Sequence, residues 1–506
     1  MGRWLALGLF AVALPAAKAA LIYLAGHANH DVAWLLVAAE RLFDGGRYYH
    51  DILEPNPPVT LAVMAPGLVI DDLLDIATYP AYLAWVVALI ALSSLLTWRS
   101  LPRALGRGPS DPLPEAWLVP AALCLFPWYG FGQREHLFVI LYLPALAMFQ
   151  AECRGPGRTR AAFAVPVMAL ATFGLLMKPY WLLIPAAQVA LALVDGRPVR
   201  RFVLLAAPTA TAVVAVLASL NWSLLHEWLS VVPLATAVYD AYDDPLWLPK
   251  LLPHAAMIAL VWAAHRYMVR DRLSTAVVVR DTLAAAAAAL VVVFLQRKAF
   301  PYHLLPTIQL TALAAGVVLL RLLSDGVALR RPAVTPRAAV ALVCAGLVFQ
   351  AAPVLYRAFR PVPAEERELI ALAAGPAAGR PFLAVSTSVW PAFPMALDSG
   401  AQWVGRVGCQ WMIPGALRLS QGASDGDRAQ GAHYAGIALA MLAEDIARGR
   451  PAVLAVAIGA DGQGLDGPFD LLAYLRSHDG LRGELDAYRE RARGAYWAVY
   501  DRVSPG

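Results

Sequence analysis

Residues 132–151 read Gly-Gln-Arg-Glu-His-Leu-Phe-Val-Ile-Leu-Tyr-Leu-Pro-Ala-Leu-Ala-Met-Phe-Gln-Ala, a polar cluster followed at once by a long apolar run. A helix that crosses the hydrocarbon core of a bilayer needs about 20 mostly apolar residues. Runs of this kind recur from Trp4 to Tyr356, and none follows. We therefore predict a polytopic α-helical membrane protein with about 11 transmembrane helices. The predicted spans lie near residues 4–25, 79–98, 116–131, 137–151, 161–177, 181–194, 202–220, 251–264, 275–295, 304–321 and 338–355.

The composition agrees with a membrane protein. Of the 506 residues, 59% are hydrophobic and 15% charged, against roughly 45–50% and about 25% in an average soluble protein. This excludes an ordinary cytosolic enzyme and a disordered chain. The formal net charge is +5, but the basic residues are scattered between apolar runs, so no nucleic-acid partner is expected. The four cysteines have neither disulfide nor metal-ligand spacing.

The basic residues predict the orientation of the spans. Segment 58–70 is apolar, and counting it as a span would reverse every later loop. If it lies at the membrane interface instead, the later arginine clusters fall on the same side as Arg3, as the positive-inside rule requires. We therefore expect a multi-pass protein of the bacterial inner membrane with a cytoplasmic N-terminus. The predicted outer segments are 26–78, 132–136, 178–180, 221–250 and 296–303.

The composition changes after Tyr356 to a mixed polar and apolar pattern. Short strands are predicted at 381–386, 451–458 and 495–500, with helices at 365–374, 434–448 and 469–478 between them. We predict two domains: a transmembrane domain at 1–355, which includes the first outer loop at 26–78, and a small α/β domain at 356–506. The odd number of spans places the second domain in the periplasm.

The first outer loop carries a recognisable series of residues. These are Asp31 just after the first span, the aromatic Trp34, the helical pattern Ala39-x-x-Leu42-x-x-Gly45, then Tyr49-x-Asp51 and Asn56-Pro57-Pro58. The series resembles the first loop of GT-C superfamily glycosyltransferases, especially the protein O-mannosyltransferase-like and lipid A aminoarabinose transferase-like enzymes. Many of these relatives have Lys-Pro-Pro where this chain has Asn56-Pro57-Pro58.

The resemblance implies an inverting, GT-C-type hexosyl- or pentosyltransferase with a GT-C-like membrane fold. The donor would be a polyprenyl-phosphate sugar, and the acceptor a lipid, a glycan or a protein on the periplasmic face. The first-loop acid is catalytic in the family, which assigns that role to Asp31, and Glu135 stands where the family has a second functional acid. A divalent cation, Mg or Mn, shared by Asp31 and Glu135 is one alternative, and catalysis without a metal is the other.

The chemistry of sugar transfer explains these residue types. A carboxylate takes or orients the proton of the acceptor, and cations or hydrogen-bond donors stabilise the departing phosphate. The predicted outer face supplies the substrate-binding candidates Arg134, His136, Glu54, Asn56, Lys178, Arg297, Lys298 and His303.

Each candidate also has a structural interpretation. Asp31 can cap the helix that follows it, Glu135 can pair with Arg134, and Lys178 and Lys298 can anchor the chain at the membrane surface. Three other functions remain open: a polysaccharide polymerase or ligase with a polyprenyl-diphosphate donor, a lipid-linked sugar flippase or transporter, and a structural assembly subunit. A transporter would ordinarily place polar residues near the middle of several spans.

Overall fold

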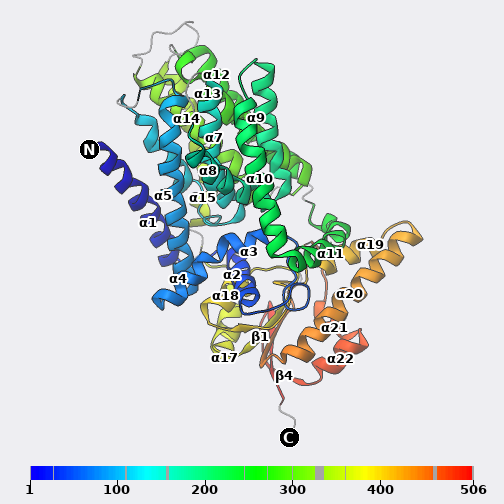
Figure 1. Cartoon of the computed structure of the whole chain (residues 1–506). Helices are drawn as coiled ribbons and strands as arrows, with labels where there is room; N and C mark the ends of the chain where they lie inside the picture. Colours follow the sequence, from blue (N-terminus) through cyan, green and yellow to red (C-terminus); the bar gives the residue numbers. More distant parts are fainter. Residues whose placement is uncertain are drawn as a thin grey trace. The chain divides into compact units, whose positions relative to one another are not determined.

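The computed structural model describes residues 2–26, 28–108, 111–154, 159–243, 246–269, 272–298, 300–324, 336–358, 361–459, 464–465 and 467–503 (Figure 1). The chain divides into two compact units. The helical unit comprises Met1–His27, Pro80–Leu220 and Asp244–Arg360. The mixed unit comprises Ala28–Tyr79, Asn221–Asp243 and Pro361–Gly506. The first loop is therefore grouped with the C-terminal residues.

The helical unit consists of apolar helices, most of which run roughly parallel in Figure 1. They are α1 (Gly2–Leu24), α5 (Thr78–Ala104), η1 (Pro114–Trp117), α6 (Leu118–Leu125), α7 (Arg134–Arg154), α8 (Ala161–Leu176), η2 (Pro179–Leu182), α9 (Leu183–Val194), α10 (Arg200–Leu220), α12 (Trp247–Met268), α13 (Arg272–Gln296), η4 (Pro301–Leu304), α14 (Leu305–Ser324) and α15 (Pro336–Ala358).

Seven helices in the described part of the chain are long and apolar enough to cross a membrane: α1, α5, α7, α10, α12, α13, and α14 together with η4. Four shorter apolar helices are Pro114–Leu125, Ala161–Leu176, Pro179–Val194 and Val340–Gln350. Each predicted span overlaps one of these helices, and the span predicted at 116–131 continues past the helix end at Leu125. Segment 58–70, which we predicted to lie outside the spans, forms the short helices α3 (Val59–Met64) and α4 (Pro66–Leu74). The length and apolar composition of these helices are those of a helical membrane protein.

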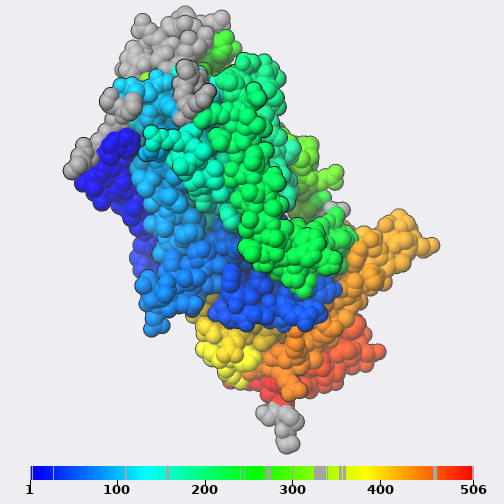
Figure 2. Space-filling model, viewed as in Figure 1, coloured from blue at the N-terminus to red at the C-terminus, as the bar shows by residue number. Residues whose placement is uncertain are grey.

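Helices α7 and α10 show the two environments of the helical unit. Every residue of α7 from Arg134 to Cys153 is buried, as expected for a helix enclosed by other helices. Helix α10 instead exposes large apolar side chains, with Val216 54% and Leu220 74% exposed, and part of its surface is visible in green in Figure 2. Apolar surface on this scale is unfavourable in water and suits a lipid environment.

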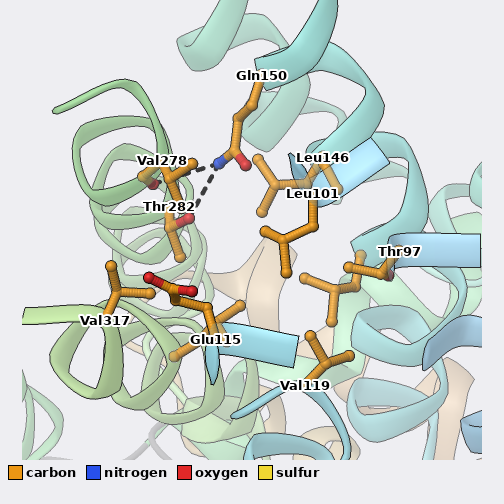
Figure 3. A pocket seen from close by; sticks show the side chains of 12 residues that line it. Thr97, Leu101, Glu115, Val119, Leu146, Gln150, Val278, Thr282 and Val317 are labelled. Atoms are coloured by element: carbon orange, nitrogen blue, oxygen red, sulfur yellow. Dashed lines mark hydrogen bonds between the residues drawn. The ribbon is translucent and has the colours of Figure 1, made fainter. Parts of the chain in front are cut away.

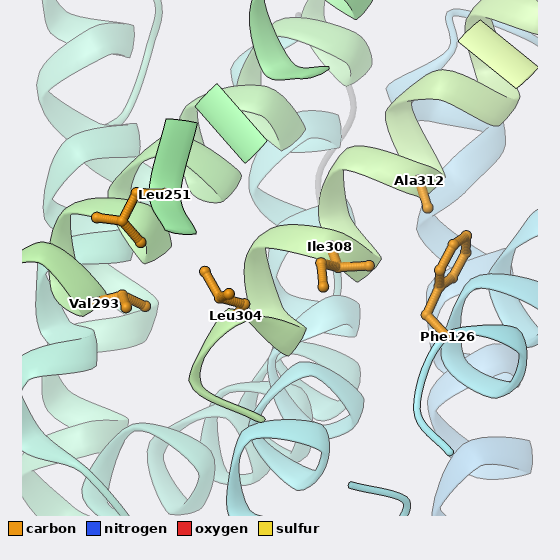
Figure 4. Packing of buried hydrophobic residues seen from close by; sticks show 6 residues of the cluster. All are labelled: Phe126, Leu251, Val293, Leu304, Ile308 and Ala312. Carbon is orange, nitrogen blue, oxygen red and sulfur yellow. The ribbon is translucent and has the colours of Figure 1, made fainter. Parts of the chain in front are cut away.

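Apolar packing joins the helices of this unit. In one cluster, Phe126 next to α6, Leu251 of α12, Val293 of α13 and Leu304 of η4 are all buried (Figure 4). Ile308 of α14 packs in the same cluster. Four separate stretches of sequence are thereby held together by side chains that carry no polar group.

Buried acids near the C-terminal end of α7 are held by arginines. Glu115 accepts hydrogen bonds of 2.7 Å from both terminal nitrogens of Arg107, and Arg321 lies 3.2 Å away. Asp281, which is fully buried in α13, accepts two bonds of 2.8 Å from Arg197. Paired, doubly hydrogen-bonded geometry of this kind is what makes a buried carboxylate tolerable.

A third acid, Glu152 of α7, accepts a 2.6 Å bond from Arg103 at the end of α5. Close by, a small cavity of about 20 Å³ is lined by Thr97, Glu115, Gln150 and Thr282 among apolar side chains (Figure 3). Gln150 donates a 3.0 Å bond to Thr282 across it, and the Thr97 hydroxyl has no hydrogen-bond partner among the described residues. A space of this size can hold a single water molecule next to its few polar groups.

The mixed unit contains a five-stranded sheet in the order β2-β1-β3-β5-β4. The strands are β1 (Pro381–Val385), β2 (Gln402–Trp403), β3 (Val453–Ala457), β4 (Tyr488–Arg493) and β5 (Trp497–Arg502). Strand β1 pairs in parallel with β2 and β3, whereas β5 is antiparallel to β3 and β4. The three predicted strands correspond to β1, β3 and β5. Strand β1 is buried after its first residue, as a central parallel strand usually is.

Helices from three separate stretches complete the mixed unit. Beside α3 and α4 they are α2 (His30–Phe43), α11 (Trp222–Val238), η3 (Tyr239–Tyr242), α16 (Ala364–Leu369), η5 (Ile370–Ala374), α17 (Gly375–Ala377), α18 (Ala392–Asp398), α19 (Met412–Ser420), α20 (Asp425–Gly449), α21 (Leu471–Arg476) and α22 (Asp479–Leu485). Helix α18 packs on α2, so the first loop has its tertiary contacts with the C-terminal residues.

Removing one partner of the Arg197–Asp281 pair should destabilise the helical unit. We expect Arg197→Met to lower the free energy of unfolding by about 3–5 kcal/mol, because Asp281 is left buried without its main partner. The double variant Arg197→Met/Asp281→Leu should recover most of this loss. Thermal unfolding of the purified protein in detergent measures the change, with the exposed Arg200→Met as control. Equal melting of Arg197→Met and the control would contradict the structural role.

Candidate functional site

The predicted site residues fall into two clusters, one in each unit. In the helical unit, Glu135 lies in the first turn of α7 and is only 1% exposed. Its Oε1 forms an ion pair with the Lys178 ammonium group, which is also buried. Lys178 directly precedes Pro179, and its extended backbone ends α8 and turns the chain into η2. The start of one helix and the end of another therefore bring the two charges together.

Aromatic rings surround the ammonium group of Lys178. Its Nζ lies 5.9 Å from the ring centre of Tyr180, 5.7 Å from that of Trp181 and 5.9 Å from that of Tyr302. All three distances are within the range of cation–π attraction. The rings and the Glu135 carboxylate together fix the position of this cation. Lys178 is recognisable in the sequence as a candidate cation, but its position beside Tyr302, more than 100 residues away, is not.

His303 borders the same cluster. Its Nε2 lies 3.8 Å from Glu135 Oε1, and its Nδ1 contacts the backbone carbonyl of Lys298. A carbonyl oxygen only accepts, so the proton is assigned to Nδ1. The segment after α13 thus contributes the Lys298 backbone, whereas the side chain of Arg297 is exposed. The structure brings Glu135, Lys178 and His303 into direct contact or close to it.

The second carboxylate oxygen of Glu135 is the unusual atom of this cluster. Oε2 is buried and has no hydrogen-bond partner within the part of the chain that the structure describes. A buried polar atom of this kind normally has a partner. Arg134 lies near enough to Glu135 to interact electrostatically, so two cations face one carboxylate when His303 is neutral. The cluster combines a net positive charge with one oxygen able to accept a proton or a hydrogen bond.

His136 has a different role in the structure. Its Nδ1 accepts a 2.9 Å bond from the Gly132 backbone N–H, and its Nε2 lies 2.8 Å from the Leu123 carbonyl. Both ring nitrogens are thus used by the backbone, and the side chain is completely buried. His136 fixes the turn that leads into α7, and so positions Glu135 one residue earlier.

In the mixed unit, Asp31 lies in the first turn of α2, but it is not the cap of that helix. Asn29 is the N-cap, and its side chain accepts a 3.1 Å bond from the Val32 backbone N–H. The Asp31 side chain is 15% exposed, with its Oδ1 3.4 Å from His30 Nε2. Since Asn29 satisfies the helix terminus, capping gives no reason for an acid at position 31.

Glu54 and Asn56 contact each other. Glu54 Oε2 accepts a 2.7 Å bond from the Trp34 indole, and Oε1 accepts a 3.0 Å bond from the Asn56 backbone N–H. The Tyr48 hydroxyl donates to the Glu54 carbonyl. Burial, and then the Glu54 carboxylate, raise the pKa of Tyr48 well above its usual value, so it remains a donor. Glu54 and Asn56 thus stabilise the conformation of the first loop.

Cys409, from the C-terminal part of the chain, lies near enough to Asp31 to interact with it electrostatically, which the sequence did not predict. Burial, followed by the nearby carboxylates of Asp31 and Glu54, raises the pKa of the Cys409 thiol. Cys409 therefore stays protonated at neutral pH and is not an activated nucleophile. No local sequence signal could have revealed this neighbour, because positions 31 and 409 are brought together only by the tertiary fold.

The surroundings of Glu135 do not suit a divalent cation. Oε1 already pairs with the ammonium group of Lys178, and Arg134 adds a second positive charge nearby, so a metal ion at Glu135 would be repelled. Among the described residues, no group of three or more His, Cys, Asp or Glu side chains is arranged to hold a metal. The charges at this cluster favour an anion instead.

Comparisons with known proteins identify no relative of this chain. No model of a protein family, no curated protein and no solved structure matches it.

Proposed function

We propose that the chain is an integral-membrane glycosyltransferase that moves a sugar from a polyprenyl-phosphate donor to an acceptor on the periplasmic face. The observation that carries the proposal is the buried cluster of Lys178, Glu135 and Arg134 at one end of α7, with its net positive charge. A phosphate group linked to a membrane lipid is an anion at the depth of a helix end, and cations in a water-poor site stabilise it strongly.

The proposed topology has eleven spans, a cytoplasmic N-terminus and a periplasmic C-terminal domain. The two ends of α7 support this arrangement. Glu135 and Glu152 are 17 residues apart, or about 25 Å along the helix, which is close to the thickness of the hydrocarbon core. The acid–arginine pairs gather around the Glu152 end, where the positive-inside rule places the cytoplasm. The Glu135 cluster then belongs to the outer face.

In the proposed reaction, Asp31 accepts the proton of an acceptor hydroxyl or amine as that group attacks the anomeric carbon. The bond from the anomeric carbon to the phosphate oxygen breaks in the same displacement, and its electron pair stays on the phosphate. A single displacement inverts the anomeric configuration. Lys178 and Arg134 stabilise the charge that develops on the phosphate. The lipid phosphate and the glycosylated acceptor are the products.

Glu135 has a supporting role in this scheme. Its Oε1 holds Lys178 in place, and its buried Oε2 is available to a donor such as a sugar hydroxyl. A site that positions its cation before the substrate arrives avoids reorganisation during the reaction. The residue that the family resemblance assigns as a second acid thus acts here mainly through Lys178.

Asp31→Asn should lower sugar transfer by roughly a hundredfold or more, the effect of removing a general base. Transfer is measured in membranes with a panel of radiolabelled polyprenyl-phosphate sugars, with protein levels matched. Asp44→Asn, an exposed acid at the end of the same helix, is the control and should keep full activity. Wild-type activity in Asp31→Asn would refute the assignment of the base. Activity only with a diphosphate donor would replace the proposal with a polymerase or ligase.

Lys178→Met should weaken transfer by about 100–1,000-fold, as expected when one group that stabilises a developing charge is removed. Lys178→Arg should retain part of the activity, because it keeps the charge but not the compact ammonium geometry. The double variant Lys178→Met/Glu135→Gln removes the uncompensated buried acid and controls for misfolding. Lys250→Met, at an exposed lysine, is the matched control. Full activity in the folded double variant would exclude Lys178 as the phosphate ligand.

A further inference from the structure

We infer that the buried Arg406–Asp445 pair positions the first loop, so that the C-terminal α/β region holds Asp31 in its working conformation. The inference rests on the proposed function, because it assigns Arg406 and Asp445 a part in the same reaction. They are positioning residues, since their effect on the reaction passes through the backbone of the first loop.

Arg406 is only 3% exposed and Asp445 only 1%. The Arg406 backbone N–H donates to Asp445 Oδ2, and its Nε donates to Oδ1, both at 2.8 Å. A terminal guanidinium nitrogen also donates to Glu444 at 2.7 Å. Burial raises the pKa of Asp445, with the Arg406 bonds opposing that shift. Both the main chain and the side chain of Arg406 are therefore fixed by one carboxylate of α20.

The carbonyl groups of the same short segment bind the first loop. The Arg406 carbonyl accepts a 2.6 Å bond from the Leu53 backbone N–H, and the Gly405 carbonyl accepts a bond from the Arg41 guanidinium group. Leu53 directly precedes Glu54, and Arg41 lies on α2. Segment 404–410 thus joins α20 on one side to the first loop on the other.

A second arginine of α20 strengthens the connection. Arg448 lies 3.0 Å from Asp51 and donates a 2.6 Å bond to the His50 carbonyl. Because Arg448 follows Asp445 by three residues, both side chains lie on the same face of α20. One helix face therefore contacts the loop directly through Arg448 and indirectly through Arg406.

The end of the segment packs against Trp34, which lies on α2. A Cβ added at Gly408 would lie 2.7 Å from Cδ2 of Trp34, so the backbone there contacts the indole ring closely. Trp34 follows Asp31 by three residues on α2 and also holds Glu54. A shift of segment 404–410 would therefore move the first turn of α2, which carries Asp31.

The native cysteine Cys409 reports on this contact. Its side chain is buried, and of the three other cysteines only Cys344 is exposed. In a Cys344→Ser background, release of the first loop should expose Cys409 to a maleimide reagent. We would measure its labelling rate by mass spectrometry in the full-length protein in lipid nanodiscs, together with transfer of the sugar that wild type uses.

Asp445→Asn should speed Cys409 labelling by about tenfold or more, the size expected when a buried charge-assisted hydrogen bond is lost. It should also lower kcat for transfer while leaving KM for the donor nearly unchanged, because donor contacts are intact. Asp425→Asn, an exposed acid at the other end of α20, should match wild type in both measurements.

Gly408→Ala is an independent test that leaves the ion pair in place. It should produce the same faster labelling and lower kcat, because the added methyl group displaces Trp34. Gly436→Ala is the matched control, since nothing lies within 4 Å of its added Cβ. Faster labelling without loss of kcat would overturn the positioning role, and so would wild-type behaviour of both test variants. If wild type transfers no sugar, the proposed function fails, whereas the labelling rates still decide whether the pair holds the loop.

Discussion

A charge buried among apolar helices requires a partner, and the helical unit depends on this constraint at both ends of α7. At one end, Lys178 neutralises Glu135 and is enclosed by aromatic rings. At the other, arginines bind Glu115, Glu152 and Asp281. These pairs join helices that are distant in sequence, and an unpaired charge in the same surroundings would favour a different packing. The acids thus restrict the number of ways in which similar apolar helices can associate.

In the mixed unit, tertiary contacts give the first loop a defined conformation. The first loop has three short helices, α2, α3 and α4, and a turn-rich segment, which would be poorly ordered alone. Hydrogen bonds from Trp34 and Asn56 fix Glu54, and the backbone of the loop is bound by the segment around Arg406. Asp31 lies on α2 three residues before Trp34, which takes part in these contacts. This is how an α/β region can define the position of a side chain on a loop.

The sequence predicted the apolar helices, the strands near 381–386, 451–458 and 495–500, and Arg134 and Lys178 as candidate cations, but not that these two lie beside one carboxylate. These features depend on local composition and periodicity, which one sequence records directly. It did not predict that Asn29 rather than Asp31 caps α2, because both residues are good caps and lie two positions apart. Nor could it predict that several of the arginines, which we interpreted as topology signals, bind buried acids. The position of Cys409 near Asp31 was equally unpredictable. Such pairings depend on long-range packing, for which a single chain gives no local signal.

The mixed unit is assembled from three stretches of chain that are separated by membrane helices. During synthesis the first loop leaves the ribosome long before residues 361–503, which supply its main partners. The loop therefore lacks its final contacts until the intervening helices and the C-terminal residues have been synthesised. A nascent chain that stops short of Arg406 would carry all of the apolar helices and no ordered first loop. The mixed unit would therefore reach its final structure only at the last stage of biogenesis, after every apolar helix has been synthesised.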